Sequence, residues 1–141
     1  MGSFSIWHWL IVLLLVVFIY INYRYCKSYK LLLLELDASV KPFNGNTAFL
    51  LFIPIFNLIW QVVLLIHIRN AIKTMKEKGL TSTSADGGFI FGLIFVILSV
   101  LSALMIEGQL SLILLLVGLF FWIITWTKVV STRKELGKNI W

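Results

Sequence analysis

Residues 48–68 read AFLLFIPIFNLIWQVVLLIHI and contain no Asp, Glu, Lys or Arg. At about 1.5 Å per helical residue, this stretch is long enough to cross a hydrocarbon core roughly 30 Å thick. It also carries Pro54, which breaks helices, and two amides, Asn57 and Gln61, which are costly in lipid unless they are hydrogen-bonded. The stretch is therefore predicted to be kinked at Pro54 and to span the membrane, or to be re-entrant there and leave on the side it entered.

Three further runs lack charged residues, namely residues 6–23, 89–106 and 110–127. Sixty per cent of the chain is hydrophobic, and its mean hydropathy is +0.99, well above the usage of soluble globular domains. The connecting segments are too short to bury a core of their own. We therefore expect an all-α integral membrane protein with three or four transmembrane helices, forming a single membrane domain over residues 1–141.

The third and fourth runs are joined by Glu107, Gly108 and Gln109 alone. Such a short connection predicts a tight antiparallel helical hairpin, with the Glu107 carboxylate hydrated at the membrane surface. At the other end of the fourth run, Trp122 and Trp126 are typical of the membrane interface.

The basic residues all lie between or after the hydrophobic runs and give the chain a net charge of +6. Here they are expected to set topology and to meet anionic lipid, and nucleic acid is not expected as a partner. Four spans with both termini inside would place eight of the twelve basic residues in the cytoplasm. A re-entrant second run would place all twelve there and the amino terminus outside, and both threadings remain open.

Residues 31–40 are apolar at first but too short to cross a membrane. They are predicted to form a separate interfacial helix on the membrane surface. Cys26 is the one cysteine, so no internal disulfide and no cysteine metal cluster is expected. Alkylation of Cys26 in intact cells would report on which side of the membrane it lies.

Small residues recur on one side of the third and fourth runs, where they permit close helix packing in lipid. The positions are Gly88, Gly92, Ser99, Ser102 and Ala103 in the third run, and Ser111, Gly118 and Thr125 in the fourth. These two small-residue faces either pack against each other, or one of them docks a partner subunit or a second copy of the chain.

A polar stripe is predicted on the second run, where Asn57, Trp60, Gln61 and His67 fall within an arc of about 120° on a continuous helix. In one interpretation, the two amides satisfy backbone groups freed by Pro54. In the other, the stripe lines a path for a substrate or protons, with His67 as the titratable group.

Catalytic signatures are missing from the sequence. It contains no His-Glu-x-x-His, no Gly-x-Ser-x-Gly and no glycine-rich phosphate loop. We therefore expect no enzymatic activity, no cofactor and no metal. The expected function is that of a non-catalytic accessory or scaffold subunit of a membrane assembly, docking through small-residue helix faces. The alternative is a small oligomeric channel or transporter lined by the second run.

Two stretches resemble known families. Residues 5–13, SIWHWLIVL, resemble the start of the small pore-forming subunit of the twin-arginine protein translocase. That family continues with Phe-Gly and a basic amphipathic helix, which this chain replaces with Phe18-Ile19-Tyr20 and an apolar run, so the resemblance does not imply the translocase activity. Residues 51–60, LFIPIFNLIW, resemble the Ile-Pro-x-x-Asn-Leu signature of small uncharacterised bacterial inner-membrane proteins, which implies a location in that membrane.

Overall fold

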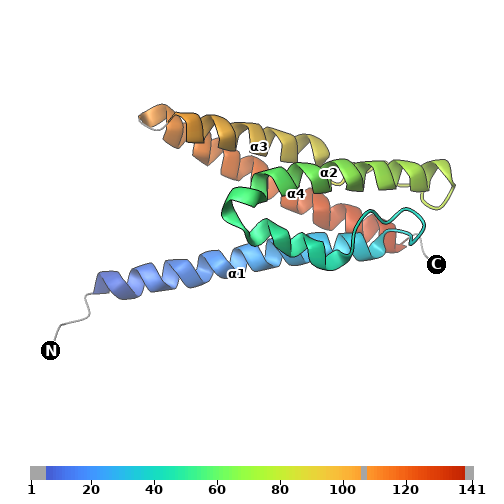
Figure 1. Ribbon diagram of the computed structural model, residues 1–141, viewed down its shortest axis with the longest axis horizontal. Helices are drawn as coiled ribbons and strands as arrows, with labels where there is room; N and C mark the ends of the chain where they lie inside the picture. Colours follow the sequence, from blue (N-terminus) through green and yellow to red (C-terminus); the bar gives the residue numbers. More distant parts are fainter. Residues whose placement is uncertain (1–5, 106–107, 139–141) are drawn as a thin grey trace.

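The computed structural model describes residues 6–105 and 108–138, and all the secondary structure in these ranges is helical. Glu107, the predicted cap of the last connection, lies outside the described residues. The elements, in chain order (Figure 1), are α1 (Ile6–Glu35), the 3₁₀ helix η1 (Gly45–Phe52), α2 (Pro54–Glu77), α3 (Phe89–Leu104) and α4 (Gln109–Lys138). The prediction of an all-helical chain is thus confirmed.

Two of these helices are long and apolar enough to cross a membrane, over Ile6–Glu35 and Gln109–Gly137. The third apolar helix, Phe89–Leu104, is shorter.

The first helix has two halves with different surroundings. Every side chain in residues 6–20 is exposed, whereas the second half buries Tyr25, Cys26 and Tyr29 and then two of its leucines. The prediction of a separate interfacial helix at residues 31–40 is wrong. The leucines continue the inner stripe of α1 at helical spacing, and Leu32 and Leu33 are fully buried in the core.

The chain leaves α1 through a short turn. Hydrogen bonds from the hydroxyl and the backbone N–H of Ser39 lower the pKa of Asp37 below its ordinary value. The ammonium of Lys78 also donates to the Ser39 hydroxyl, at 3.3 Å, so the turn is tied to the end of α2.

The second hydrophobic run is broken between η1 and α2. Ile53 is extended, with φ −81° and ψ 113°, and Pro54 begins α2, where its fixed φ suits the first turn and its missing N–H costs nothing. Beyond the break the chain reverses, since the indole N–H of Trp60 donates to the backbone oxygen of Thr47, at 2.8 Å. The run thus folds back on itself at Ile53–Pro54, and Figure 1 shows η1 and α2 side by side.

The last two helices pack along each other in opposite directions. The hydroxyl of Ser102 donates to the backbone oxygen of Ser111, and the hydroxyl of Ser111 donates to the backbone oxygen of Ser102. Both distances are 3.0 Å. At the other end of the pair, a Cβ added to Gly92 would lie 3.2 Å from the Thr125 methyl carbon. Gly88 precedes α3 with φ +80°, a conformation that favours glycine.

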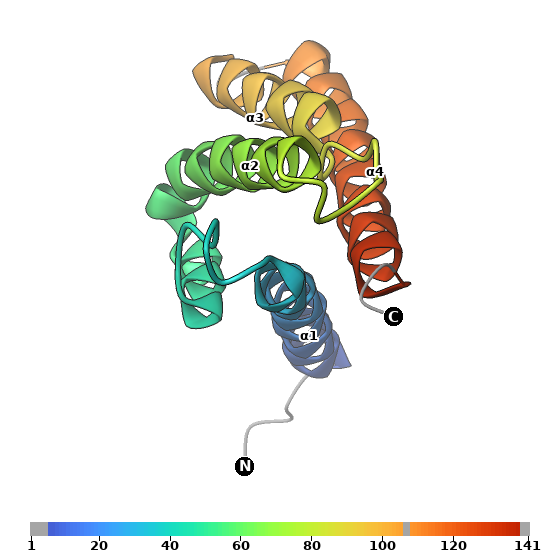
Figure 2. The ribbon, with the colours of Figure 1, turned by 90° about the vertical axis from the view of Figure 1, so that its right-hand side faces the viewer.

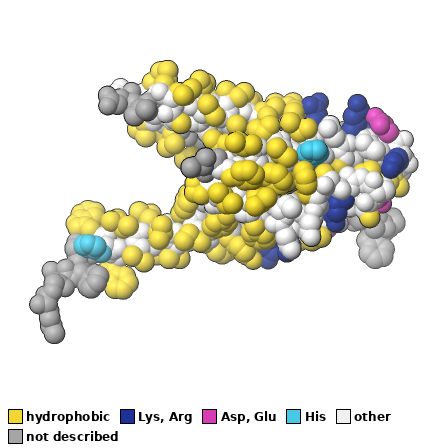
Figure 3. All heavy atoms as spheres, viewed as in Figure 1, with side chains coloured by type: hydrophobic (Ala, Val, Ile, Leu, Met, Phe, Trp, Pro, Cys, Tyr) yellow, Lys and Arg dark blue, Asp and Glu magenta, His cyan; other side chains and the backbone are white. Residues whose placement is uncertain are grey.

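The buried core lies at one end of the molecule, among the second half of α1, η1, α2 and the second half of α4. Its largest fully buried apolar side chains are Tyr29, Leu32, Leu33, Leu51, Leu64, Leu65, Ile68, Val129 and Leu136. Figure 2 looks onto this end, where α1, α2 and α4 come together. At the opposite end, the first half of α1 diverges from the α3–α4 pair (Figures 1 and 3).

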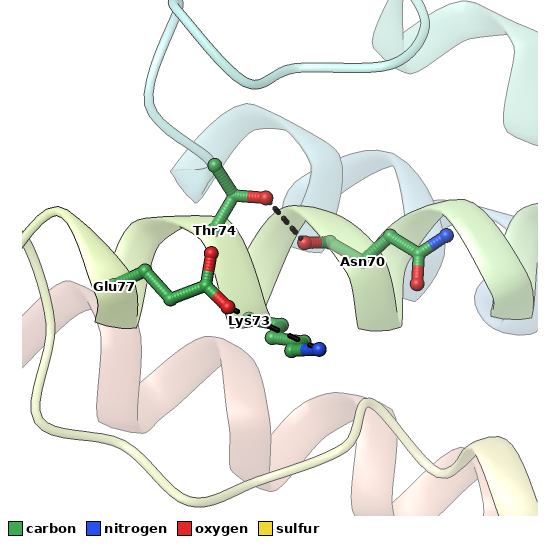
Figure 4. Close-up of polar contacts among 4 residues, drawn as sticks. All are labelled: Asn70, Lys73, Thr74 and Glu77. Carbon is green, nitrogen blue, oxygen red and sulfur yellow. Dashed lines mark hydrogen bonds and ion pairs between the residues drawn. The ribbon is translucent and has the colours of Figure 1, made fainter.

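Charged side chains gather at the core end. On the face shown in Figure 3, apolar side chains cover the diverging helices, and Lys, Arg, Asp and Glu lie toward the other end. Figure 4 shows part of this polar end, where Lys73 and Glu77 form an exposed ion pair at 3.9 Å and the Thr74 hydroxyl donates to the Asn70 backbone oxygen. Such an exposed pair within one helix contributes only about 0.3–0.5 kcal/mol.

Candidate functional site

The best-defined polar site is a buried junction between α1 and α2. Gln61 is fully buried, and its side-chain N–H donates to the Tyr25 hydroxyl at 2.7 Å. The Tyr25 hydroxyl in turn donates to that of Tyr29, at the longer distance of 3.4 Å. Tyr25 and Tyr29 are one helical turn apart, so both hydroxyls reach the same side of α1. This buried amide and the two hydroxyls hold α1 against α2.

Two tryptophans from α4 extend the junction. The ring of Tyr25 lies 4.9 Å from that of Trp122 and 6.0 Å from that of Trp126, measured between centroids. The indole N–H of Trp126 donates to the Ser28 hydroxyl at 2.8 Å, and that hydroxyl donates to the Arg24 backbone oxygen at 2.9 Å. The junction therefore connects three helices through aromatic packing and directed hydrogen bonds.

Two amide oxygens near the junction have no hydrogen-bond partner within the described residues. They are Oε1 of Gln61 and Oδ1 of Asn57, and both atoms are buried. An unpaired buried acceptor costs about 1–3 kcal/mol. These two oxygens are thus unsatisfied acceptors in the interior of the described fold, on the same side of α2 one helical turn apart.

The structure divides the predicted polar stripe into two parts. Gln61 bonds to Tyr25, so its amide does not supply the backbone groups at Pro54, as one interpretation expected. His67 is exposed and lies edge-on to the ring of Phe43, with centroids 4.9 Å apart. Trp60 packs on the same Phe43 ring, at 5.2 Å. His67 and Gln61 consequently face different surroundings, the surface and the core.

The small-residue faces of α3 and α4 largely pack against each other. A Cβ on Gly118 would lie 3.7 Å from Leu98 and 4.0 Å from the Ser99 hydroxyl, and one on Gly88 would lie 3.1 Å from the Thr125 backbone oxygen. A Cβ on Gly92 would also collide with Leu65 of α2, so this glycine permits contact among three helices. Ala103, by contrast, is exposed. Docking of a partner onto these faces would require α3 and α4 to separate.

The loop at residues 79–88 is fastened to α4, and the two helices that flank the loop also contact each other. The hydroxyl of Thr83 donates to the Glu135 carboxylate on α4. The Arg69 guanidinium of α2 lies 4.4 Å from the centroid of the Phe89 ring, at the start of α3. Within the loop, the Asp86 carboxylate accepts from the Gly88 N–H at 2.9 Å. The polar end is therefore a defined structure on which surface sites can be built.

Groups suited to hold a metal ion are lacking in the part of the chain that the structure describes, since no three His, Cys, Asp or Glu side chains come together there. The Cys26 thiol is buried, with 1% of the residue exposed. A thiol reagent would therefore fail to reach Cys26 from either side of the membrane. The expectation that Cys26 reports on topology is wrong.

Sequence reasoning missed the partners of Gln61. Tyr25 lies 36 positions away, in a different hydrophobic run, and no periodicity links the two. One signal was present, because Tyr25 and Tyr29, like Trp122 and Trp126, are spaced by four residues and so line one side of a helix.

Comparisons of the chain with protein-family models, with curated proteins and with solved structures found no significant match to any of them.

Proposed function

We propose that the protein is an integral membrane protein that serves as a non-catalytic accessory or scaffold subunit of a membrane assembly. The observation that carries this proposal is the division of the molecule into an apolar end and a charged end. The apolar end exposes large hydrophobic side chains on residues 6–20 of α1 and along α3 and α4. In water this exposure would be strongly unfavourable, whereas in a bilayer it matches the solvent.

The level at which the two ends meet can be followed from helix to helix. Tyr25 packs on Trp122, and Arg69 lies over Phe89. The first basic residue of each helix follows at or just after this level, namely Arg24 in α1, Arg69 in α2 and Lys128 in α4, and Figure 3 shows Lys and Arg side chains toward that end. This arrangement supports the threading with every basic residue on one side of the membrane.

The lengths of the helices fit the same threading. Residues 6–23 of α1 and 109–127 of α4 would each extend about 27 Å, and the 16 residues of α3 about 24 Å. The run made of η1 and α2 reverses at Pro54, so it would enter the membrane and leave on the same side. We therefore propose three crossings, in which α3 and α4 form a membrane hairpin, and one re-entrant segment.

The subunit role rests on the space between α1 and the α3–α4 pair. The small-residue faces are used within the chain, yet the side chains of residues 6–20 in α1 are all exposed, and Figure 3 shows this half of α1 diverging from α3 and α4. A transmembrane helix of a partner subunit is the proposed occupant, and the resemblance of residues 51–60 supports a location of the assembly in a bacterial inner membrane.

Single introduced cysteines test the threading. In a Cys26→Ala background, Ser39→Cys and Ser82→Cys would place thiols in the first and second connections, and Gln109→Cys would place one at the far end. An impermeant reagent should label positions 39 and 82 from the same side and position 109 from the opposite side. Four plain spans would put positions 39 and 82 on opposite sides, which would refute the re-entrant segment.

Site-specific photo-crosslinking tests the subunit role. A photoreactive residue at Val12 or Val16, both exposed on the first half of α1, should give a discrete adduct with one membrane protein in native membranes. The same residue at Lys73, on the polar end, serves as the control and should not give that adduct. Adducts with only a second copy of this chain would contradict the accessory role and favour an oligomeric pore.

A further inference from the structure

A groove of about 380 Å³ lies between α1 and α4 at the charged end. Arg24 and Ser28 of α1 form one wall, and Trp126, Ser131 and Lys134 are among the residues of the other. The bond from the Trp126 indole N–H to the Ser28 hydroxyl joins the two walls. The groove is therefore a built feature of the fold, held by a contact between helices.

The groove carries two cations and no carboxylate in its lining. Neither Arg24 nor Lys134 forms an ion pair within the described residues. The neighbouring acid, Glu135, accepts from the hydroxyls of Thr83 and Ser131. The two positive charges thus face the groove without an internal partner, and an anion would supply one.

Two other hollows at this end differ in that respect. The hollow beside Lys128 is lined by Asp86 and Glu135 as well. The hollow beside Arg69 also contains Lys73 and Lys76, but its lining includes the Asp86 carboxylate, and Lys73 is already paired with Glu77. A carboxylate in the lining repels an anionic ligand. Among these hollows, the groove between α1 and α4 is the one suited to an anion.

The position of the groove identifies the kind of anion. One helical turn before Arg24, α1 exposes Tyr20, and one turn before Thr127, α4 exposes Ile123. From these residues toward the apolar end, both helices expose hydrophobic side chains. A molecule in the groove would therefore meet cations at one end and an apolar surface at the other, as a phospholipid requires.

We propose that this groove binds the phosphate of an anionic phospholipid, with the acyl chains lying along the apolar halves of α1 and α4. The Arg24 guanidinium suits bidentate hydrogen bonding to two phosphate oxygens, and the Lys134 ammonium adds a point charge. The Ser28 hydroxyl already donates to the backbone, so recognition falls to the two cations. This inference rests on the membrane placement proposed above.

Lipid titration followed by native mass spectrometry in a neutral detergent tests the proposal. The probes are phosphatidylglycerol, phosphatidylcholine and inorganic phosphate. The variant Arg24→Gln/Lys134→Gln is compared with Lys27→Gln/Lys41→Gln, which removes the same charge outside the groove. The groove variant should weaken phosphatidylglycerol binding at least about tenfold, and the control variant less than about twofold. Arg24→Lys keeps the positive charge but loses the two parallel N–H donors of the guanidinium, so it should give an intermediate loss of phosphatidylglycerol affinity.

Four outcomes would overturn the proposal. Equal losses of phosphatidylglycerol affinity in both double variants would show a diffuse charge effect. Equal affinity for phosphatidylcholine and phosphatidylglycerol would show that the groove does not recognise the negative charge. Competition by millimolar inorganic phosphate would show that the site takes free phosphate in place of a lipid. Cysteine labelling tests the membrane placement independently. If the labelling pattern is the expected one and the groove variant binds phosphatidylglycerol as tightly as the native protein, the lipid site is refuted and the membrane placement stands.

Discussion

The side-chain N–H of Gln61 donates a 2.7 Å hydrogen bond to the Tyr25 hydroxyl, and both residues lie in the interior of the protein. The other amide atom, Oε1 of Gln61, has no partner in the described part of the chain. One half of this amide therefore stabilises the contact of α1 with α2, and the other half opposes it.

This asymmetry predicts unequal effects of removing either partner. Gln61→Leu loses the bond but also the unpaired oxygen, so the free energy of unfolding should change by less than about 1 kcal/mol. Tyr25→Phe leaves the whole amide unpaired and should cost about 1–3 kcal/mol. The double variant should then be more stable than Tyr25→Phe alone. Denaturant unfolding in mixed micelles, followed by circular dichroism, measures all three, and additive losses would contradict the coupling.

The two glycines of the α3–α4 pair should respond in opposite directions to the same change. Gly92→Ala places a methyl group against Leu65 and Thr125 and should destabilise the protein by about 1–3 kcal/mol. Gly118→Ala meets Leu98 at 3.7 Å, an ordinary contact, and should be neutral or stabilise by up to about 1 kcal/mol. Thermal unfolding in detergent distinguishes them, and equal shifts of Tm would show that Gly92 is not the tighter position.

The reciprocal serine pair should contribute a small amount to the packing of α3 on α4. Ser102→Ala and Ser111→Ala each remove one hydrogen bond between the helices and should each cost about 0.6 kcal/mol, the mean for such bonds in membranes. Ser99→Ala is the control, because its hydroxyl donates to the Phe95 backbone oxygen within α3. A loss as large in the control as in the pair would show that the serines act within their own helices.

The bond from Thr83 to Glu135 should restrain the loop at residues 79–88. In Thr83→Val the donor is lost, and we expect cleavage in this loop under limited proteolysis to become several-fold faster, since local opening exposes the backbone. Ser84→Ala changes an exposed neighbour and should leave the rate unchanged. Equal cleavage rates in the Thr83 variant and the native chain would mean that Asp86 and Arg69 suffice to hold the loop.

Local chemistry explains which features could be predicted from the sequence. A proline restricts its own φ and the residue before it, so the break at Ile53–Pro54 follows from the residues alone. Small residues at helical spacing likewise mark close approach, as Gly92 does. In both cases the signal is confined to one segment, and no knowledge of the rest of the fold is needed.

The rest depends on contacts between distant segments. Leu32 and Leu33 read as part of a short apolar patch, because their burial comes from helices that appear later in the chain. One of the two interpretations of Gln61 assigned its amide to backbone groups of its own helix. That interpretation misses the partner, because Tyr25 lies in another run. A pattern along one helix indicates that a polar group must be satisfied, but tertiary packing determines what satisfies it.

The solitary first half of α1 also has a consequence for the order in which the protein is assembled. The side chains of residues 6–20 are all exposed, so this half of α1 needs no later helix of the described chain to become stable in lipid. We expect this half to enter the bilayer as soon as it is synthesised. Leu65, in contrast, packs on Gly92, and Tyr25 packs on Trp122, so α2 and the second half of α1 must wait for α3 and α4. Biogenesis would then proceed as early anchoring by α1 followed by later closure, in which α4 packs against the second half of α1.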